Sequence, residues 1–217
     1  MKSSGIKTST VLASFLLAAC LSMRAEVKLP AIFSDGMVMQ QQTNANLWGT
    51  ATPNKKVTVT TGWNGKQYAV TADKNGSWKL SVSTPEAGGP YTITFDDGTQ
   101  KTLNNILIGE LWLCSGQSNM EMPMKGFKNQ PVENANMDIL HSKNPQIRLF
   151  TVKRTSTFTP QNDVIGSWKE ANPVSVREFS ATAYYFGRLV NEILDVPVGL
   201  VVAAWGGSAC EAWMTAD

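Results

Sequence analysis

The stretch "NILIGELWLCSGQSNM" (Asn105–Met120) changes character at Ser115, where a nearly continuous apolar run gives way to small polar residues. Such a run is typical of a strand buried on both faces, as in a parallel sheet between helices. The loop Ser115-Gly116-Gln117-Ser118-Asn119 then stands where this strand reaches solvent. Ligands of open parallel α/β sheets bind beyond the C-terminal ends of the strands. This loop is therefore the first candidate for a functional site.

A second stretch repeats the pattern. "VPVGLVVAAW" (Val196–Trp205) is apolar throughout and ends in Gly206-Gly207-Ser208. Before it, residues 119–175 are less regular, and we expect a helix within 130–142 and a strand at Ile147–Val152. Strands that alternate with helices and end in Gly- and Ser-rich loops predict the beginning of a parallel α/β sheet over residues 108–217.

The segment "SATAYYFGRLVNEIL" predicts the helix that precedes the second strand. Ser180 is suited to cap its N-terminus, and Asp195 ends it. The apolar residues recur at helical spacing, so we expect one face to be buried. The residues expected on that face are Ala183, Phe186, Val190 and Ile193.

Residues 27 to about 107 predict an all-β region. "KVTVT" (Lys56–Thr60) and "SWKLSVS" (Ser77–Ser83) alternate apolar and polar residues with a period of two. Asn64-Gly65 and Asp97-Gly98 are turn sequences, because they tolerate the positive φ of tight hairpins. Short strands at this spacing predict an antiparallel β-sandwich domain, over residues 26–107.

The N-terminus resembles an export signal. Lys2 and Lys7 precede the apolar run "VLASFLLAACLS", which is too short to span a bilayer. We expect residues 1–25 to be a signal peptide that is cleaved after Ala25. The alternative is a lipobox that leaves a lipid anchor on Cys20. Either reading predicts an exported protein, periplasmic or extracellular, and we expect no membrane span.

The net charge bears on whether the protein binds nucleic acid, and the cysteines bear on whether it forms a disulfide. Without Lys2, Lys7 and Arg24, the 19 basic residues fall to 16, against 17 acidic residues. Nucleic-acid binding needs a concentrated basic charge, so we expect no nucleic-acid partner. Cys114 and Cys210 remain in the mature chain. An oxidising compartment permits a disulfide between them, but we favour two small buried side chains.

The two Gly- and Ser-rich loops contain the groups that acyl transfer needs. Ser118, in a tight turn at a strand end, is exposed enough to be a nucleophile, and its own N–H is available to an oxyanion. Gly206 or Gly207 lets a second N–H approach the same point, because neither has a Cβ. In the alternative reading, Ser118 caps a helix and the glycines only turn the chain.

The stretches "LWLCSGQSNMEMPM", "VPVGLVVAAWGGSACEAW" and "VKLPAIFSDGMVMQQQ" together resemble the sialate O-acetylesterase family, in the SGNH hydrolase superfamily. The resemblance implies an SGNH-type α/β domain with a three-layer architecture after the β-sandwich. It also implies that Ser118 is the nucleophile, with an acyl-enzyme intermediate. The Ser118 N–H and that of Gly206 or Gly207 would bind the oxyanion, and Gln117 and Asn119 would contact the substrate. It further implies an O-acetylated sugar or sialoglycan as substrate, with neither metal nor cofactor.

One part of the family pattern does not stand at its expected position. The family has its catalytic Asp and His in a D-x-x-H motif near the end of a longer chain, and here the single histidine is His141, at an unrelated position. We therefore expect the sequence to be an N-terminal fragment that is inactive alone. The alternatives are a pseudoenzyme and a carbohydrate-binding module that uses the β-sandwich. Trp48, Trp63 and Trp78 suit a sugar platform, but we interpret them mainly as sandwich core.

Overall fold

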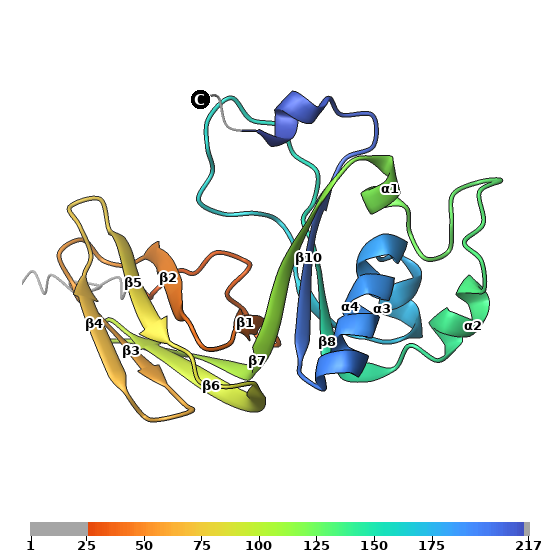
Figure 1. Cartoon of the computed structure of the whole chain (residues 1–217). Coiled ribbons are helices and arrows are strands. Elements are labelled where there is room, and N and C mark those ends of the chain that lie inside the picture. Colours follow the sequence, from red (N-terminus) through yellow and green to blue (C-terminus); the bar gives the residue numbers. More distant parts are fainter. Residues whose placement is uncertain (1–25, 215–217) are drawn as a thin grey trace, which may run out of the picture.

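The computed structural model describes residues 26–214. The predicted signal peptide and Cys20 lie outside these residues. Figure 1 shows a β-rich unit on one side and a unit of strands and helices on the other, with strand β7 running between them. In chain order the elements are β1 (Val38–Gln40), β2 (Asn44–Thr50), β3 (Lys56–Thr61), β4 (Gln67–Thr71), β5 (Ser77–Ser83), β6 (Gly88–Asp96), β7 (Gln100–Gly116), α1 (Ser118–Glu121), α2 (Ala135–Leu140), β8 (Asn144–Thr151), β9 (Trp168–Ala171), α3 (Pro173–Arg177), α4 (Ala181–Leu194), β10 (Val198–Ala204) and the 3₁₀ helix η1 (Cys210–Trp213).

The N-terminal unit is built from two groups of strands around one apolar cluster. β4, β3, β6 and β7 are joined side by side, and β2 pairs with β5 in a separate two-stranded sheet. Leu47 and Trp78 from the small sheet are buried against Val59 and Phe95 from the large one. The alternation of buried and exposed residues in these strands is what the period of two in the sequence predicts.

Strand β7 connects the two units. It has 17 residues, and its first half pairs with β6 while its second half pairs with β10. The boundary expected near residue 107 therefore lies inside one continuous strand. Gly109 lies where β7 changes its pairing partner from β6 to β10. A Cβ at this position would lie 2.0 Å from the carbonyl oxygen of Pro197. No other residue permits so close an approach.

The second unit has the expected parallel strands. β7, β10 and β8 lie parallel in that order, and β9 is antiparallel to β8. Among the described residues, helices α2, α3 and α4 lie on one face of this sheet (Figure 1). On the opposite face, Leu113 is 70% exposed. The described residues therefore form two layers here, and the three-layer arrangement stays an expectation.

Helix α4 begins and ends where the sequence predicts, but its buried face is partly different. The Ser180 side chain accepts a hydrogen bond from the Ala183 N–H, and Asp195 ends the helix with a left-handed conformation. Ala183 is buried, whereas Phe186 is 39% and Ile193 is 69% exposed. The strip that faces the sheet contains Tyr184 and Gly187 instead. Gly187 lets α4 approach β10 closely, because an added Cβ would lie 2.5 Å from the Leu200 side chain.

Two smaller expectations need correction. Cys114 is buried and burial raises the pKa of its thiol, but Cys210 is exposed, and both are free thiols. Of the three tryptophans expected in the sandwich core, only Trp78 is fully enclosed there, at 4% exposure, while Trp48 and Trp63 are half-buried. No helix among residues 26–214 is long and apolar enough to cross a membrane.

Candidate active site

Ser118 stands at the end of β7, in an exposed position. Gly116 has a φ of +146°, a conformation that favours glycine, and it turns the chain out of the strand. Gln117 occupies the N-cap position, so Ser118 is the first residue of helix α1 and does not cap it. The first N–H groups of a helix have no acceptor within the helix. The Ser118 hydroxyl and N–H therefore both lie at an open helix end.

The turn after β10 lies directly beside Ser118. The parallel register pairs Ala204 with Gly116, and the Trp205 N–H donates to the Gly116 carbonyl oxygen at 3.0 Å. A Cβ added to Gly206 would lie 3.6 Å from both the Cα and the Cβ of Ser118. The structure thus brings together the two loops that the sequence singled out, because both follow neighbouring parallel strands.

The two glycines differ in their hydrogen bonds. The Gly206 N–H donates to Oε2 of Glu121 in α1. Gly207 has a φ of +79°, and nothing lies within 4 Å of where its Cβ would be. In the part of the chain that the structure describes, the Gly207 N–H has no hydrogen-bond acceptor. Of the two candidate donors, only the Gly207 N–H is therefore open to a ligand.

Glu121 joins three segments at this point. One carboxylate oxygen accepts from Gly206, and the other lies 2.9 Å from Nη1 of Arg154, in the connection between β8 and β9. Sequence reasoning missed Glu121. The signal was present, because Ser118-x-x-Glu121 has the spacing of a capping box. The carboxylate bonds across to Gly206 instead of back to its own helix.

Gln117 and Asn119, expected to contact the substrate, flank Ser118 with different surroundings. The Gln117 side-chain amide donates to the Ser208 carbonyl oxygen, so it also holds the two loops together. The Asn119 side chain is exposed, and the backbone carbonyl oxygen of Asn119 accepts from the Thr182 hydroxyl at 3.0 Å. These hydrogen bonds do not show whether either side chain contacts a substrate, so both roles stay predictions.

An aromatic side chain missed by sequence reasoning stands next to these loops. The Trp213 indole N–H, from η1, donates to the Ser208 hydroxyl at 2.8 Å, and that hydroxyl donates to the Trp205 carbonyl oxygen. Trp205 and Trp213 are 40% and 39% exposed. Two partly exposed indoles therefore lie at the turn that follows β10.

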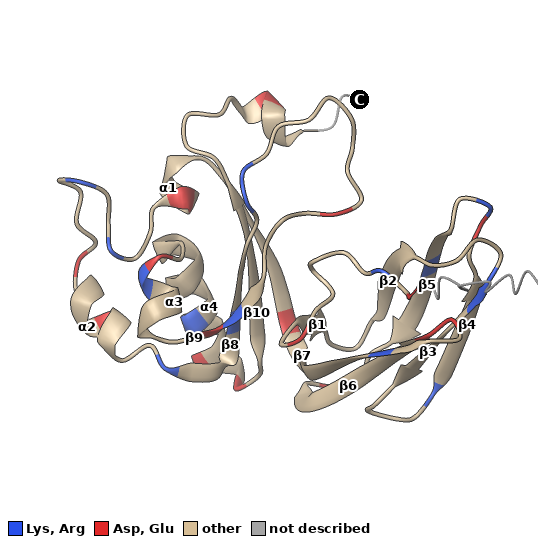
Figure 2. Ribbon diagram, turned by 180° about the vertical axis from the view of Figure 1, so that it is seen from behind, with Lys and Arg blue, Asp and Glu red and all other residues tan. Residues whose placement is uncertain are grey.

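His141 does not belong to this group. It is the C-cap residue of α2, where its N–H donates to the Met137 carbonyl oxygen at 3.0 Å. Both ribbon views place α2 at the outer edge of the helix layer, away from α1 (Figures 1 and 2). Residues 26–214 contain no group of three His, Cys, Asp or Glu side chains arranged to hold a metal ion.

Comparison with known proteins gives one consistent result. The family model described as "Carbohydrate esterase, sialic acid-specific acetylesterase" matches residues 108–217, which is just over half of the chain. The chain is 28% identical over 204 residues to the sialate O-acetylesterase of Pongo abelii, and 31% identical over 196 residues to that of Mus musculus. These alignments cover 86% and 82% of this chain, and 38% and 35% of the relatives.

A solved structure agrees with the sequence comparisons. The crystal structure of a carbohydrate acetylesterase from Xanthomonas citri matches with a TM-score of 0.81 and 34% sequence identity. The match covers 88% of this chain and 43% of that protein. The chain thus spans well under half the length of these relatives. Together, the family match and the resemblance across both units show that the chain belongs to the sialic acid-specific acetylesterase family of carbohydrate esterases.

Proposed function

We propose that this chain carries the nucleophile loop of a serine esterase that removes O-acetyl groups from sugars, with O-acetylated sialic acid as the class of substrate. The observation that carries the proposal is the position of Gly206 next to the exposed Ser118, at the ends of parallel strands. Family membership supports the reaction type, and the two loops would supply a hydroxyl and backbone N–H donors to one carbonyl group.

In the proposed reaction, Ser118 Oγ attacks the carbonyl carbon of the acetyl ester while its proton passes to a base. The N–H groups of Ser118 and Gly207 would donate to the oxyanion of the tetrahedral intermediate. The sugar oxygen then leaves with the proton, and acetyl-Ser118 remains. Water attacks this acyl-enzyme, releases acetate and restores the hydroxyl. Gly207 is preferred to Gly206 as the donor because Glu121 already occupies the Gly206 N–H.

We propose that the base in this scheme is the histidine of the family's Asp–His pair and is not His141. His141 is the single histidine of the sequence, and it caps α2 on the far side of the helix layer. A neutral serine hydroxyl is a poor nucleophile without a base to accept its proton. The chain alone is therefore expected to have little activity.

We also propose the finer features of organisation that the sequence predicts. These are a β-sandwich before an SGNH-type α/β domain, and export to the periplasm or beyond through residues 1–25, with lipid attachment at Cys20 as the alternative. The two-sheet packing of the N-terminal unit supports the first of these.

The test is release of acetate from O-acetylated sialic acid. It compares this chain alone with the chain fused to the part of the Xanthomonas citri acetylesterase that it does not cover. We expect turnover by the fusion, none by its Ser118→Ala variant, and no effect of His141→Ala. If the chain alone turns over well above its own Ser118→Ala variant, a base exists within these residues and the assignment of the base is wrong. If the fusion folds and Ser118→Ala leaves its rate unchanged, Ser118 is not the nucleophile.

A second candidate function is sugar binding without hydrolysis. The remote position of His141 favours it, because no histidine among residues 26–214 then lies beside Ser118. It predicts affinity for a glycan that does not change with Ser118→Ala, and no acetate release from the fusion.

A further inference from the structure

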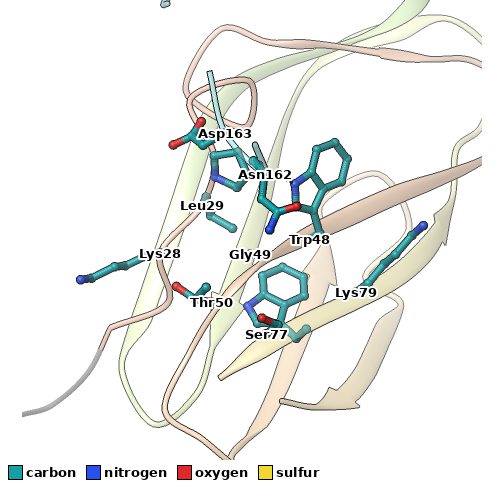
Figure 3. A pocket seen from close by; sticks show the side chains of 11 residues that line it. Lys28, Leu29, Trp48, Gly49, Thr50, Ser77, Lys79, Asn162 and Asp163 are labelled. Carbon is teal, nitrogen blue, oxygen red and sulfur yellow. Dashed lines mark hydrogen bonds between the residues drawn. The ribbon is translucent and has the colours of Figure 1, made fainter. Parts of the chain in front are cut away.

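A large cavity of the described residues lies away from Ser118. It has a volume of about 640 Å³ and lies on the N-terminal unit, where residues 28–30, β2 and β5 meet residues 162–163 (Figure 3). Clefts that bind small molecules in proteins have volumes of roughly 300–1,000 Å³. Size therefore permits this cavity to hold a sugar ring.

Trp48 forms a wall of the cavity and is not a member of the buried core cluster. It is paired with Lys79 across β2 and β5, so both side chains lie on the outer face of the small sheet. The neighbours Leu47 and Trp78 belong to the buried cluster between the sheets, and Trp48 does not. Core packing therefore does not account for a half-buried indole on the outer face of this strand.

The Trp48 ring is held in a fixed orientation. Its indole N–H donates to the Asn162 carbonyl oxygen at 3.1 Å, and Phe33 packs edge-to-face at a centroid distance of 4.5 Å. Figure 3 shows the indole between Asn162 and Lys79. A rigid aromatic face suits the C–H groups of a sugar ring, because the face of the ring is electron-rich. Rigidity also lowers the entropy lost on binding.

The loop segment that closes the cavity is itself fixed to the N-terminal unit. Oδ1 of Asp163 accepts from the N–H groups of Ala31 and Val164, each at 2.7 Å. Among residues 26–214, Oδ2 of Asp163 has no hydrogen-bond donor, so it is open to a sugar hydroxyl. The Trp78 indole N–H, in the same lining, is buried and has no protein acceptor in this part of the chain. Unsatisfied buried donors are uncommon in native proteins.

The charges around the cavity favour an anionic sugar. Lys28 and Lys79 stand at opposite sides, and neither forms an ion pair with another described residue (Figure 3). Lys28 points away from the other side chains in this view, and Asp163 lies on the side of the cavity opposite Lys79. Lys79, beside Trp48 and away from Asp163, is therefore the cation placed to meet a carboxylate.

We propose that this cavity binds a carboxylate-bearing sugar ring, which stacks on Trp48 and pairs its carboxylate with Lys79. The site is separate from Ser118, so it is a second glycan contact and does not depend on hydrolysis. Its occupant is one sugar of a larger acidic glycan, because the cavity is open at the surface and bounded by exposed polar side chains.

The test is isothermal titration calorimetry of the chain with sialyllactose and trigalacturonate, and with lactose as the neutral probe. We expect an acidic probe to bind, and lactose to bind about fivefold more weakly or not at all. Trp48→Ala should weaken binding about tenfold, and Lys79→Ala about two- to fivefold. Circular dichroism of each variant checks that it folds.

Matched controls distinguish binding in this cavity from binding elsewhere on the chain. Trp63 is also half-buried in the N-terminal unit and donates its indole N–H to a carbonyl oxygen at 3.1 Å, but it does not line the cavity. Trp63→Ala and the exposed Lys55→Ala should leave binding unchanged, as should Ser118→Ala. The proposal is overturned if neither acidic probe binds, if lactose binds equally well, or if folded Trp63→Ala loses as much affinity as Trp48→Ala. Loss of binding in Ser118→Ala would place the sugar at the proposed active site instead.

Discussion

At the scale of single residues, the geometry beside Ser118 depends most on Glu121. Its carboxylate connects α1 to the turn at Gly206 and to Arg154, three segments that are far apart in the sequence. A hydrogen bond to a charged acceptor is roughly twice as strong as one between neutral groups. Glu121 is therefore expected to position the proposed oxyanion donors through the turn.

This role predicts a graded response to substitution in the fusion protein. Glu121→Ala removes the acceptor, lets the turn move, and should lower kcat for acetate release about tenfold with little change in KM. Glu121→Gln keeps an acceptor for the Gly206 N–H and should retain most of the rate. The control is Glu178→Ala, which removes a carboxylate from an exposed pair with Lys125. Equal loss in the Ala and Gln variants would contradict a positioning role for the hydrogen bond.

At the scale of elements, helix α2 is attached to α4 by a small polar cluster. Asp138 accepts from the Tyr185 hydroxyl at 2.6 Å and from Nη1 of Arg188 at 2.7 Å. The hydrogen bond from Tyr185, followed by that from Arg188, lowers the pKa of Asp138 below its ordinary value of 3.8. Burial, together with Asp138, raises the pKa of Tyr185 to about 12. The carboxylate form of Asp138 therefore stabilises the folded state.

The cluster predicts a pH-dependent stability difference. Because the folded pKa of Asp138 is lowered, its contribution is present above about pH 4 and is lost as the pH falls through the folded pKa. Asp138→Asn should lower the free energy of unfolding by about 1 kcal/mol at pH 7, and by less near pH 3. Urea unfolding at both pH values measures this. A variant that is destabilised equally at pH 7 and pH 3 would show that packing, not charge, accounts for the loss.

At the scale of the entire chain, the two units are connected by a shared strand and by hydrogen bonds between them. Strand β7 belongs to both, and Arg148 of β8 reaches into the N-terminal unit. Its guanidinium donates to the Gly36 carbonyl oxygen at 3.3 Å and to Oδ1 of Asn105 at 3.1 Å. Trp168 of β9 donates its indole N–H to the Ile32 carbonyl oxygen at 2.8 Å. These bonds couple the folding of the two units.

This coupling predicts a single cooperative unfolding transition for the chain. Calorimetry should give one peak, because neither unit keeps a complete β7 without the other. Arg148→Ala removes the buried bonds between the units and should lower stability by about 2–3 kcal/mol, with the peak broadened or split. The control is Arg177→Ala, at an exposed site. Two separate peaks in the unmodified chain would contradict the coupling.

Elements with a strong local signal could be predicted from the amino-acid sequence. They are the apolar runs that become β7 and β10, the capped helix α4 and the β-rich first half, because burial on two faces, capping and alternation leave regular patterns. The same patterns placed the loops of Ser118 and Gly206 at strand ends. Since parallel neighbours end at one edge of a sheet, these loops could be expected to meet.

Features that depend on residues far apart in the chain became visible only in the folded protein. The exposure of Phe186 and Ile193 follows from where α4 lies on the sheet, which helical periodicity does not specify. The hydrogen bond from the Gly206 N–H to Glu121 joins residues that are 85 positions apart. The hydrogen bond from Trp48 to Asn162, beside the cavity, joins residues that are 114 positions apart. Local sequence patterns do not specify such partners. They meet only when the packing of both units brings distant segments together.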